Sequence, residues 1–262
     1  MTWATTTWYG TGIADGARDP ATRQLALAGA AALVDAFDDR YGLIPAAAVP
    51  RSGFGARVGV EGLGCTVRLL GFAADEGHHE FDVLAGWHVD RLVGLLLDPD
   101  GRARREVRLP PVASRTSTRS DVDAGPHAQA WALLGLTAAA SRWGRFVLPA
   151  RRAGLWWLEH FGTRVPAVPL KDSAGAVDTS AAVVAAAGLL ELFQVTGDRQ
   201  WDTAARALVD DVVGRYLDGG ILRDGWYEPG SPTRSRGEVV RGSFFLTAVL
   251  MVLTGRIRRP LW

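Results

Sequence analysis

Glu61 is the acidic side chain whose surroundings in the sequence best suit proton transfer. It lies in the run Val-Gly-Val-Glu-Gly-Leu-Gly, from Val58 to Gly64, which is apolar and rich in glycine. Burial in such a setting disfavours the charged form and raises the pKa of a carboxyl group, which suits a general acid. The sequence therefore predicts Glu61 as the catalytic acid. The alternative, an exposed glutamate at a helix start, fits the same residues.

A second segment follows Gly125-Pro126 and carries a histidine and a tryptophan four residues apart. His127 and Trp131 share one face of the predicted helix, because residues four apart are neighbours on a helix surface. His127 can donate a hydrogen bond to an anionic ligand there, while Trp131 packs beneath a ring of that ligand. A core or surface histidine fits the same spacing, so both interpretations stand.

A third helix start runs from Asp178 to Ala182 and reads Asp-Thr-Ser-Ala-Ala. The simplest interpretation is an N-cap, in which the Asp178 carboxylate accepts backbone N–H groups and its charge suits the positive end of the helix. The functional interpretation adds that Asp178 or Ser180 faces a ligand.

The sequence predicts no metal site and no cofactor. Cys65 is the only cysteine, so the chain can form neither an intramolecular disulfide nor a site with several cysteine ligands. His78 and His79 are adjacent, and adjacent side chains on a helix diverge rather than converge on one ion. Neither a phosphate-binding glycine loop nor the motifs G-x-S-x-G and H-E-x-x-H occur.

Apolar residues at three- and four-residue spacing predict helices through most of the chain. Several links between the predicted helices are very short, and short links make neighbouring helices antiparallel. Pro20 and Asp198 lie in two of these links, where proline suits a first helical turn and aspartate suits an N-cap. The predicted helices cover residues 2–17, 21–39, 59–75, 79–97, 127–142, 146–161, 179–196, 201–217 and 239–253. Longer loops cover residues 40–57, 98–126, 162–177 and 218–238.

The alternation of short and long links predicts a stack of helix hairpins with all the long loops at one end, where ligands bind. We therefore expect one all-α domain over residues 1–262. Its loops should bring four side chains around one cavity, namely those of Glu61, His127, Trp131 and Asp178.

Composition bears on partners and on location. The formal net charge is +1, so the balance of charge favours neither nucleic acid nor an anionic membrane. The first residues lack the basic and apolar regions of a signal peptide, and the longest apolar runs, such as residues 181–190, are too short to span a bilayer. The sequence predicts a cytoplasmic protein that acts on a small molecule or an oligosaccharide.

Together these helix starts resemble those of unsaturated glucuronyl hydrolases. That family has a helix start of the form R-G-Q-x-W, then D-S/T-S-A-A-x-x-A-A-x-G-L-L-E-L, and then a late W-G-D-Y-Y/F helix. The first reads His-Ala-Gln-Ala-Trp here over residues 127–131, and residues 178–192 follow the second closely. The third is reduced to Arg-Gly-Ser-Phe-Phe over residues 241–245. The resemblance is strongest over residues 125–217.

The resemblance implies a barrel of six helix hairpins, written (α/α)6, and hydration of the double bond of an unsaturated uronic sugar. It places Glu61 at the family's acid/base aspartate, His127 where the family has arginine, and Ser243 where it has aspartate. A second essential aspartate of the family would fall at or before Met1. The resemblance also implies a set of substrate contacts: His127, Gln129, Trp131, Asp178 and Ser180.

The family barrel has twelve helices, and about nine are predicted here, so we expect an incomplete toroid. A second copy of the chain, or the tail from Arg256 to Trp262, would cover its apolar open side. Two other functions remain open. The barrel could catalyse cyclisation or hydration of a metabolite other than a sugar, or it could be a catalytically inactive binding or assembly module.

Overall fold

The computed structural model describes residues 19–46, 57–109, 125–168, 176–225 and 237–257. These residues are mostly helical, as the sequence predicts. The first predicted helix, over residues 2–17, lies outside the described residues. The described helices are α2 (Pro20–Asp35), α3 (Leu63–Asp75), α4 (His79–Leu96), α5 (Pro126–Arg142), α6 (Val147–His160), α7 (Thr179–Thr196), α8 (Arg199–Tyr216) and α9 (Val240–Leu253), with a short 3-10 turn, η1 (Gly144–Phe146), before α6.

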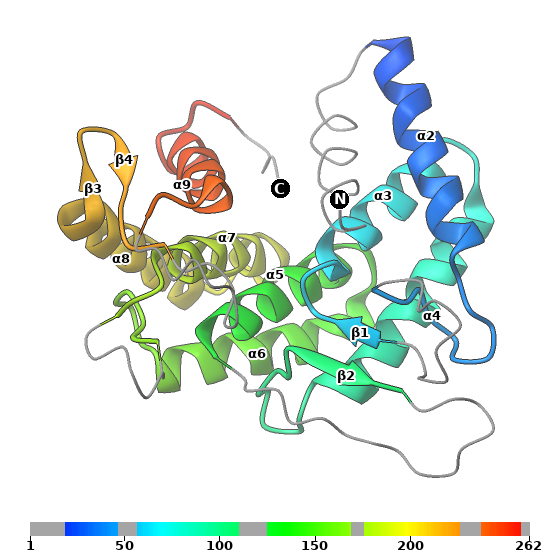
Figure 1. Cartoon of the computed structure of the whole chain (residues 1–262), viewed down its shortest axis with the longest axis horizontal. Helices are drawn as coiled ribbons and strands as arrows, with labels where there is room; N and C mark the ends of the chain where they lie inside the picture. Colours follow the sequence, from blue (N-terminus) through cyan, green and yellow to red (C-terminus); the bar gives the residue numbers. More distant parts are fainter. Residues whose placement is uncertain (1–18, 47–56, 110–124, 169–175, 226–236, 258–262) are drawn as a thin grey trace.

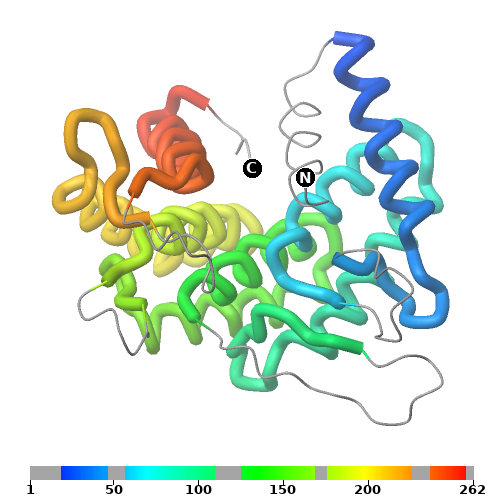
Figure 2. Tube along the Cα trace, viewed as in Figure 1, coloured from blue at the N-terminus to red at the C-terminus, as the bar shows by residue number. Residues whose placement is uncertain are grey.

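The helices form hairpins that stack side by side in an arc. The pairs α3 and α4, α5 and α6, and α7 and α8 are each joined by a short turn and pack on one another. The first helix of each pair also packs on the first helix of the next, so that α3, α5, α7 and α9 form one continuous row. Figure 1 shows this row backed by α4, α6 and α8. In Figure 2 the colours follow the sequence around an arc from α2 to α9, rather than around a closed ring.

The row of first helices forms the core of the protein. Residues 179–192 of α7 are all buried, and α7 packs on α5, α8 and α9. By length and hydropathy α7 could span a membrane, but 78% of it is buried inside the protein, as in a core helix. Gly188 lets α5 and α7 come close, because a Cβ atom there would lie 2.9 Å from Leu133 Cγ and 3.1 Å from the Leu134 backbone nitrogen.

The predicted helix start at Gly59 is wrong. Strand β1 (Arg57–Gly59) pairs antiparallel with β2 (Glu106–Arg108), and the helix begins only at Leu63. The paired side chains of Val58 and Val107 are both buried, and their burial against the helices holds the extended backbone in place. Glu61 therefore lies in the turn between a strand and a helix. A second small ladder joins β3 (Leu217–Asp218) and β4 (Ile221–Leu222).

Helix α2 also ends earlier than predicted, at Asp35 rather than at residue 39. The carbonyl oxygen of Asp38 instead accepts the N–H groups of Tyr41 and Gly42 in a tight turn. Two predicted caps are confirmed. Pro20 occupies the first turn of α2, and the Asp198 carboxylate accepts the Gln200 N–H at the start of α8.

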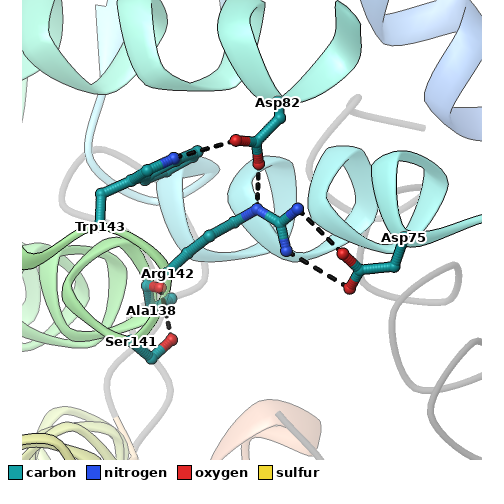
Figure 3. Close-up of polar contacts among 6 residues, drawn as sticks. All are labelled: Asp75, Asp82, Ala138, Ser141, Arg142 and Trp143. Carbon is teal, nitrogen blue, oxygen red and sulfur yellow. Dashed lines mark hydrogen bonds and ion pairs between the residues drawn. The ribbon is translucent and has the colours of Figure 1, made fainter. Parts of the chain in front are cut away.

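The end of the row opposite the starts of α3, α5 and α7 is held by a polar cluster around Arg142 (Figure 3). The Arg142 guanidinium donates to Asp82 and forms two hydrogen bonds with Asp75, of 3.0 and 3.3 Å. The second oxygen of Asp82 accepts the Trp143 indole N–H at 3.1 Å. Because Asp75 ends α3, Asp82 lies in the first turn of α4 and Arg142 ends α5, the cluster ties three helices together at this end.

Part of the open edge is apolar. On α9, Val240 is 84% exposed and Phe244 is 39% exposed. Residues 258–262 of the tail expected to cover this side lie outside the described residues. Coverage by that tail or by a second copy stays a prediction.

His88 gives the fold an expected dependence on pH. It is buried in α4, and its Nδ1 accepts the Ile44 N–H at 3.1 Å. Burial lowers the pKa of His88 to about 4 from 6.5. The unfolded chain therefore binds a proton at His88 below pH 6.5, whereas the folded chain does so only near pH 4. The contribution of neutral His88 to the free energy of unfolding is therefore fully present above pH 6.5. It decreases by about 3 kcal/mol as the pH falls from 6.5 to 4.

We expect His88→Asn to flatten the pH dependence of the free energy of unfolding between pH 7 and pH 4, measured by urea denaturation. His79→Asn, at an exposed histidine, is the matched control and should leave the slope unchanged. An equal slope in wild type and His88→Asn would contradict this assignment.

Candidate functional site

Three predicted side chains meet where the row of helices begins. Glu61 precedes α3, His127 is the second residue of α5, and Asp178 is the N-cap of α7. His127 Nε2 lies 3.0 Å from Glu61 Oε1, and His127 Nδ1 lies 4.0 Å from Asp178 Oδ2. The histidine ring thus has a carboxylate near each of its two nitrogens. The short contact with Glu61 requires a hydrogen on Nε2.

Asp178 is the N-cap of α7, as the simplest interpretation predicts, and it also lies beside His127. Its side chain is 2% exposed. Oδ1 accepts the Ala181 N–H at 3.0 Å and the Ser180 hydroxyl at 2.6 Å, which leaves Oδ2 on the side of the histidine. The backbone N–H of Asp178 donates to the Pro166 carbonyl. These bonds fix Asp178 in place, so it can orient the histidine ring. Ser180 acts here on Asp178, and at 2% exposure it is not at the surface.

Two arginines complete the cluster, and the sequence analysis missed both as site residues. Arg105 Nη2 lies 3.2 Å from Glu61 Oε1, and the Arg105 carbonyl accepts the Val60 N–H at 3.1 Å. Arg241, in the first turn of α9, contributes a positive charge that acts on Glu61. Arg241 opens the third of the family-like segments, which was a usable signal. Arg105 lies in a loop with no motif.

The prediction that burial raises the pKa of Glu61 is wrong. Burial does act in that direction, but the hydrogen bond and charge of His127 outweigh it, together with the charges of the two arginines. The pKa of Glu61 falls to about 2 from an ordinary value of 4.5. Glu61 is therefore ionised in the ligand-free protein at neutral pH. In this state it can accept a proton but has none to donate.

Gln129 does not face the site. It is fully buried, and its amide nitrogen donates to the carbonyls of Gly101 and Ala153 at 2.9 and 3.0 Å. Its amide oxygen accepts the Ala103 N–H at 2.8 Å. All three bonds are to backbone groups, so the expected substrate contact is replaced by a structural role. Gln129 anchors the loop that leads from α4 to Arg105.

Trp131 is also a core residue rather than an open platform for a sugar ring. It is 4% exposed, and its ring packs edge-on against Phe245 at 5.7 Å. The ring of His127 lies 6.2 Å away and is tilted relative to the indole. Trp131 therefore lies beside His127 as part of the core on which the histidine ring rests.

That Glu61, His127, Trp131 and Asp178 surround one cavity stays a prediction. A small cavity beneath the turn that carries Glu61 is lined entirely by apolar residues, including Val60, Leu63 and Leu96, and by none of these four side chains. Glu61 and His127 reach solvent, with side chains 30% and 19% exposed. No group of three or more His, Cys, Asp or Glu side chains in the described part is arranged to hold a metal ion.

Comparisons with known proteins identify the fold of the chain. No protein-family model matches the chain, and no curated protein matches it in sequence. Among solved structures, the unsaturated glucuronyl hydrolase of Bacillus sp. GL1 is similar with a TM-score of 0.81 at 19% identity, over 94% of this chain and 71% of that one. The enzyme of Streptococcus agalactiae is similar with a TM-score of 0.80 at 17% identity, over 93% and 67%. This chain has the fold of unsaturated glucuronyl hydrolases.

An unsaturated glucuronyl hydrolase specific for heparin gives the same result, with a TM-score of 0.80 at 18% identity, over 91% of this chain and 70% of that one. The predicted fold of stacked helix hairpins is thereby confirmed. Two structures among the relatives are described with saccharides, dGlcA-Glc-Rha-Glc and dGlcA-GalNAc6S.

Proposed function

We propose that the chain is a glycoside hydrolase-like enzyme that hydrates the double bond of an unsaturated uronic sugar or a related anionic metabolite. The observation that carries the proposal is the meeting of Glu61, His127 and Asp178 at the starts of α3, α5 and α7, the first helices of three neighbouring hairpins. Arg105 and Arg241 beside them supply positive charge for a ligand carboxylate. The cytoplasm remains the proposed location.

The chemistry requires one proton donor and one proton acceptor. Hydration adds a proton to one carbon of the double bond and the hydroxyl group of a water molecule to the other. The resulting hemiketal opens and releases the sugar that was linked through the glycosidic oxygen. Ionised Glu61 is suited to take the proton of the attacking water, and the hydrogen on His127 Nε2 is the nearby source for the carbon. Asp178 Oδ2, 4.0 Å from the second ring nitrogen, supplies a negative charge that favours this orientation of the ring.

One observation favours a second function, that of a catalytically inactive binding module. The charge of Glu61 is balanced by His127 and Arg105 at 3.0 and 3.2 Å, which is also the arrangement of an ion cluster that only stabilises loops. Activity separates the two functions, because an inert cluster can bind a ligand but cannot consume it.

The test is turnover of unsaturated uronate disaccharides, followed by loss of the ultraviolet absorbance of the conjugated double bond. We expect steady loss of absorbance with release of the second sugar in equal amount. Binding of the disaccharide without any loss of absorbance would support the binding module and refute hydration.

Asp178→Asn tests the positioning role of Asp178. Asparagine is also a good N-cap, so α7 should still form, but the negative charge beside His127 Nδ1 is removed. We expect kcat/KM to fall about 10- to 100-fold, as when other supporting partners of a histidine are removed. The pH profile of kcat/KM should shift at the same time, which a purely structural role would not cause.

Asp198→Asn is the matched control, because Asp198 is the N-cap of α8 and its contacts do not include the site. It should leave both kcat/KM and the pH profile unchanged. Equal effects of the two substitutions would mean that Asp178 acts only through its helix.

A further inference from the structure

The outer face of the ladder formed by β1 and β2 carries two arginines in direct register. Arg57 pairs with Arg108, and Figure 1 shows the two strands, β1 and β2, side by side. Their neighbours Val58 and Val107 are buried on the other face, so alternation along the strands turns both arginines outward. The two side chains are 48% and 66% exposed. Like charges directly opposite one another destabilise a ladder.

A single carboxylate lies between these two charges. Glu106 Oε2 is 3.3 Å from Arg57 Nε, and Glu106 Oε1 is 3.8 Å from Arg108 Nε. Glu106 is the one acidic partner of either arginine among the described residues. Two positive charges thus share one negative charge. The exposed guanidinium nitrogens have the fork geometry that binds a carboxylate or a sulfate through two oxygens.

The arginine pair is continuous with the candidate site. Glu106 directly follows Arg105, whose guanidinium contacts Glu61, and Gly59 at the end of β1 is two residues from Glu61. Arg105 and Arg108 are three residues apart, which is about 10 Å along an extended chain. A short saccharide bound at Glu61 can therefore reach the pair.

We propose that Arg57 and Arg108 form a subsite for a second oxyanion group, a carboxylate or a sulfate, on the sugar next to the one bound at Glu61. The subsite rests on the proposed function, since it assumes that the ligand is a saccharide with an anionic sugar at Glu61. It selects substrates that are negatively charged on both sugars. Glu106 competes with the ligand for the same two guanidinium groups.

The test measures binding by titration calorimetry with saturated uronate disaccharides, which the protein cannot hydrate. The second sugar is neutral in the first probe, a uronate in the second and a sulfate ester in the third. We expect the doubly anionic probes to bind wild type about tenfold more tightly than the first, with an advantage that shrinks as salt is added. The ranking of the second and third probes shows whether the subsite prefers carboxylate or sulfate.

Three variants test which residues cause the tighter binding of the doubly anionic probes. The difference in affinity between these probes and the first probe should disappear in the double variant Arg57→Gln/Arg108→Gln. It should increase several-fold in Glu106→Gln, which removes the competing carboxylate. Arg206→Gln is the matched control, because Arg206 is 52% exposed and pairs with Asp202 on α8. It should leave the advantage unchanged.

Equal affinity of wild type for all three probes would overturn the subsite. Tighter binding of the doubly anionic probes that survives in the double variant would overturn it too. Both results leave the proposal of hydration at Glu61 intact. Failure of all three probes to bind would overturn the subsite too. Absence of turnover despite the expected pattern of affinities would refute hydration alone.

Discussion

Glu61→Gln should lower kcat on the true substrate by at least about 100-fold, within the range that general acid–base groups contribute. Glutamine keeps the shape of the side chain but cannot take a proton from the attacking water. Because His127 and Arg105 contact Glu61, the variant leaves positive charges without their carboxylate. Thermal denaturation should therefore accompany the rate measurement, to show that the variant is folded.

Glu80→Gln is the control for this change, because Glu80 is a 66% exposed glutamate in the first turn of α4. It should keep the wild-type kcat. The pKa of Glu61 is about 2 in the free protein. Protonation of this carboxylate should therefore not lower kcat/KM near pH 4.5, where an ordinary glutamate titrates. A folded Glu61→Gln variant with activity within a few-fold of wild type would eliminate Glu61 from the chemistry.

Gly101→Ala should be the most damaging of the small substitutions, with a loss of about 3 kcal/mol or more in the free energy of unfolding. The φ angle of Gly101 is +99°, a conformation that residues with a side chain rarely adopt. A Cβ atom there would also lie 2.2 Å from the Arg152 carbonyl oxygen, which is backbone of α6 and cannot move aside. The Gly101 carbonyl accepts the Gln129 amide, so the loop toward Arg105 should shift and activity should fall as well.

Gly77→Ala separates strain from collision. Gly77 has a φ angle of +110° but no atom within 4 Å of a Cβ atom built there. The free energy of unfolding of Gly77→Ala should therefore fall only by the strain of the backbone conformation, about 1–3 kcal/mol. Urea denaturation of both variants measures the difference. Equal losses in the two would show that the loop does not need the close approach at Gly101.

Local sequence pattern was enough to place most of the helices. Helix α7 begins and ends at the predicted residues, 179 and 196, because an aspartate cap and a glycine end enclose a continuous apolar run. The turn before α3 was misjudged for the opposite reason. Its backbone is held by pairing with residues 106–108, which are far along the chain and show no periodicity that relates them to residues 57–59.

The sequence predicted that Glu61, His127 and Asp178 lie close together, but it did not predict their electrostatics. Hairpin topology was sufficient to bring Glu61, His127 and Asp178 together. The charge state of Glu61 depends also on Arg105 and Arg241, which come from other segments of the chain, so composition near Glu61 pointed to the wrong direction of the pKa shift. The structural bonds of Gln129 could not be predicted from the sequence, because its backbone partners lie in two separate segments, at residues 101–103 and at Ala153.

The most direct test of the site is a crystal structure of the Glu61→Gln variant soaked with an unsaturated uronate disaccharide. We predict that the unsaturated ring lies at the starts of α3, α5 and α7, with its double bond beside Gln at position 61 and within reach of His127 Nε2. The uronate carboxylate should lie near Arg105 or Arg241. A disaccharide that is ordered elsewhere on the protein and does not contact position 61, His127 or Asp178 would contradict the assignment of this cluster as the active site.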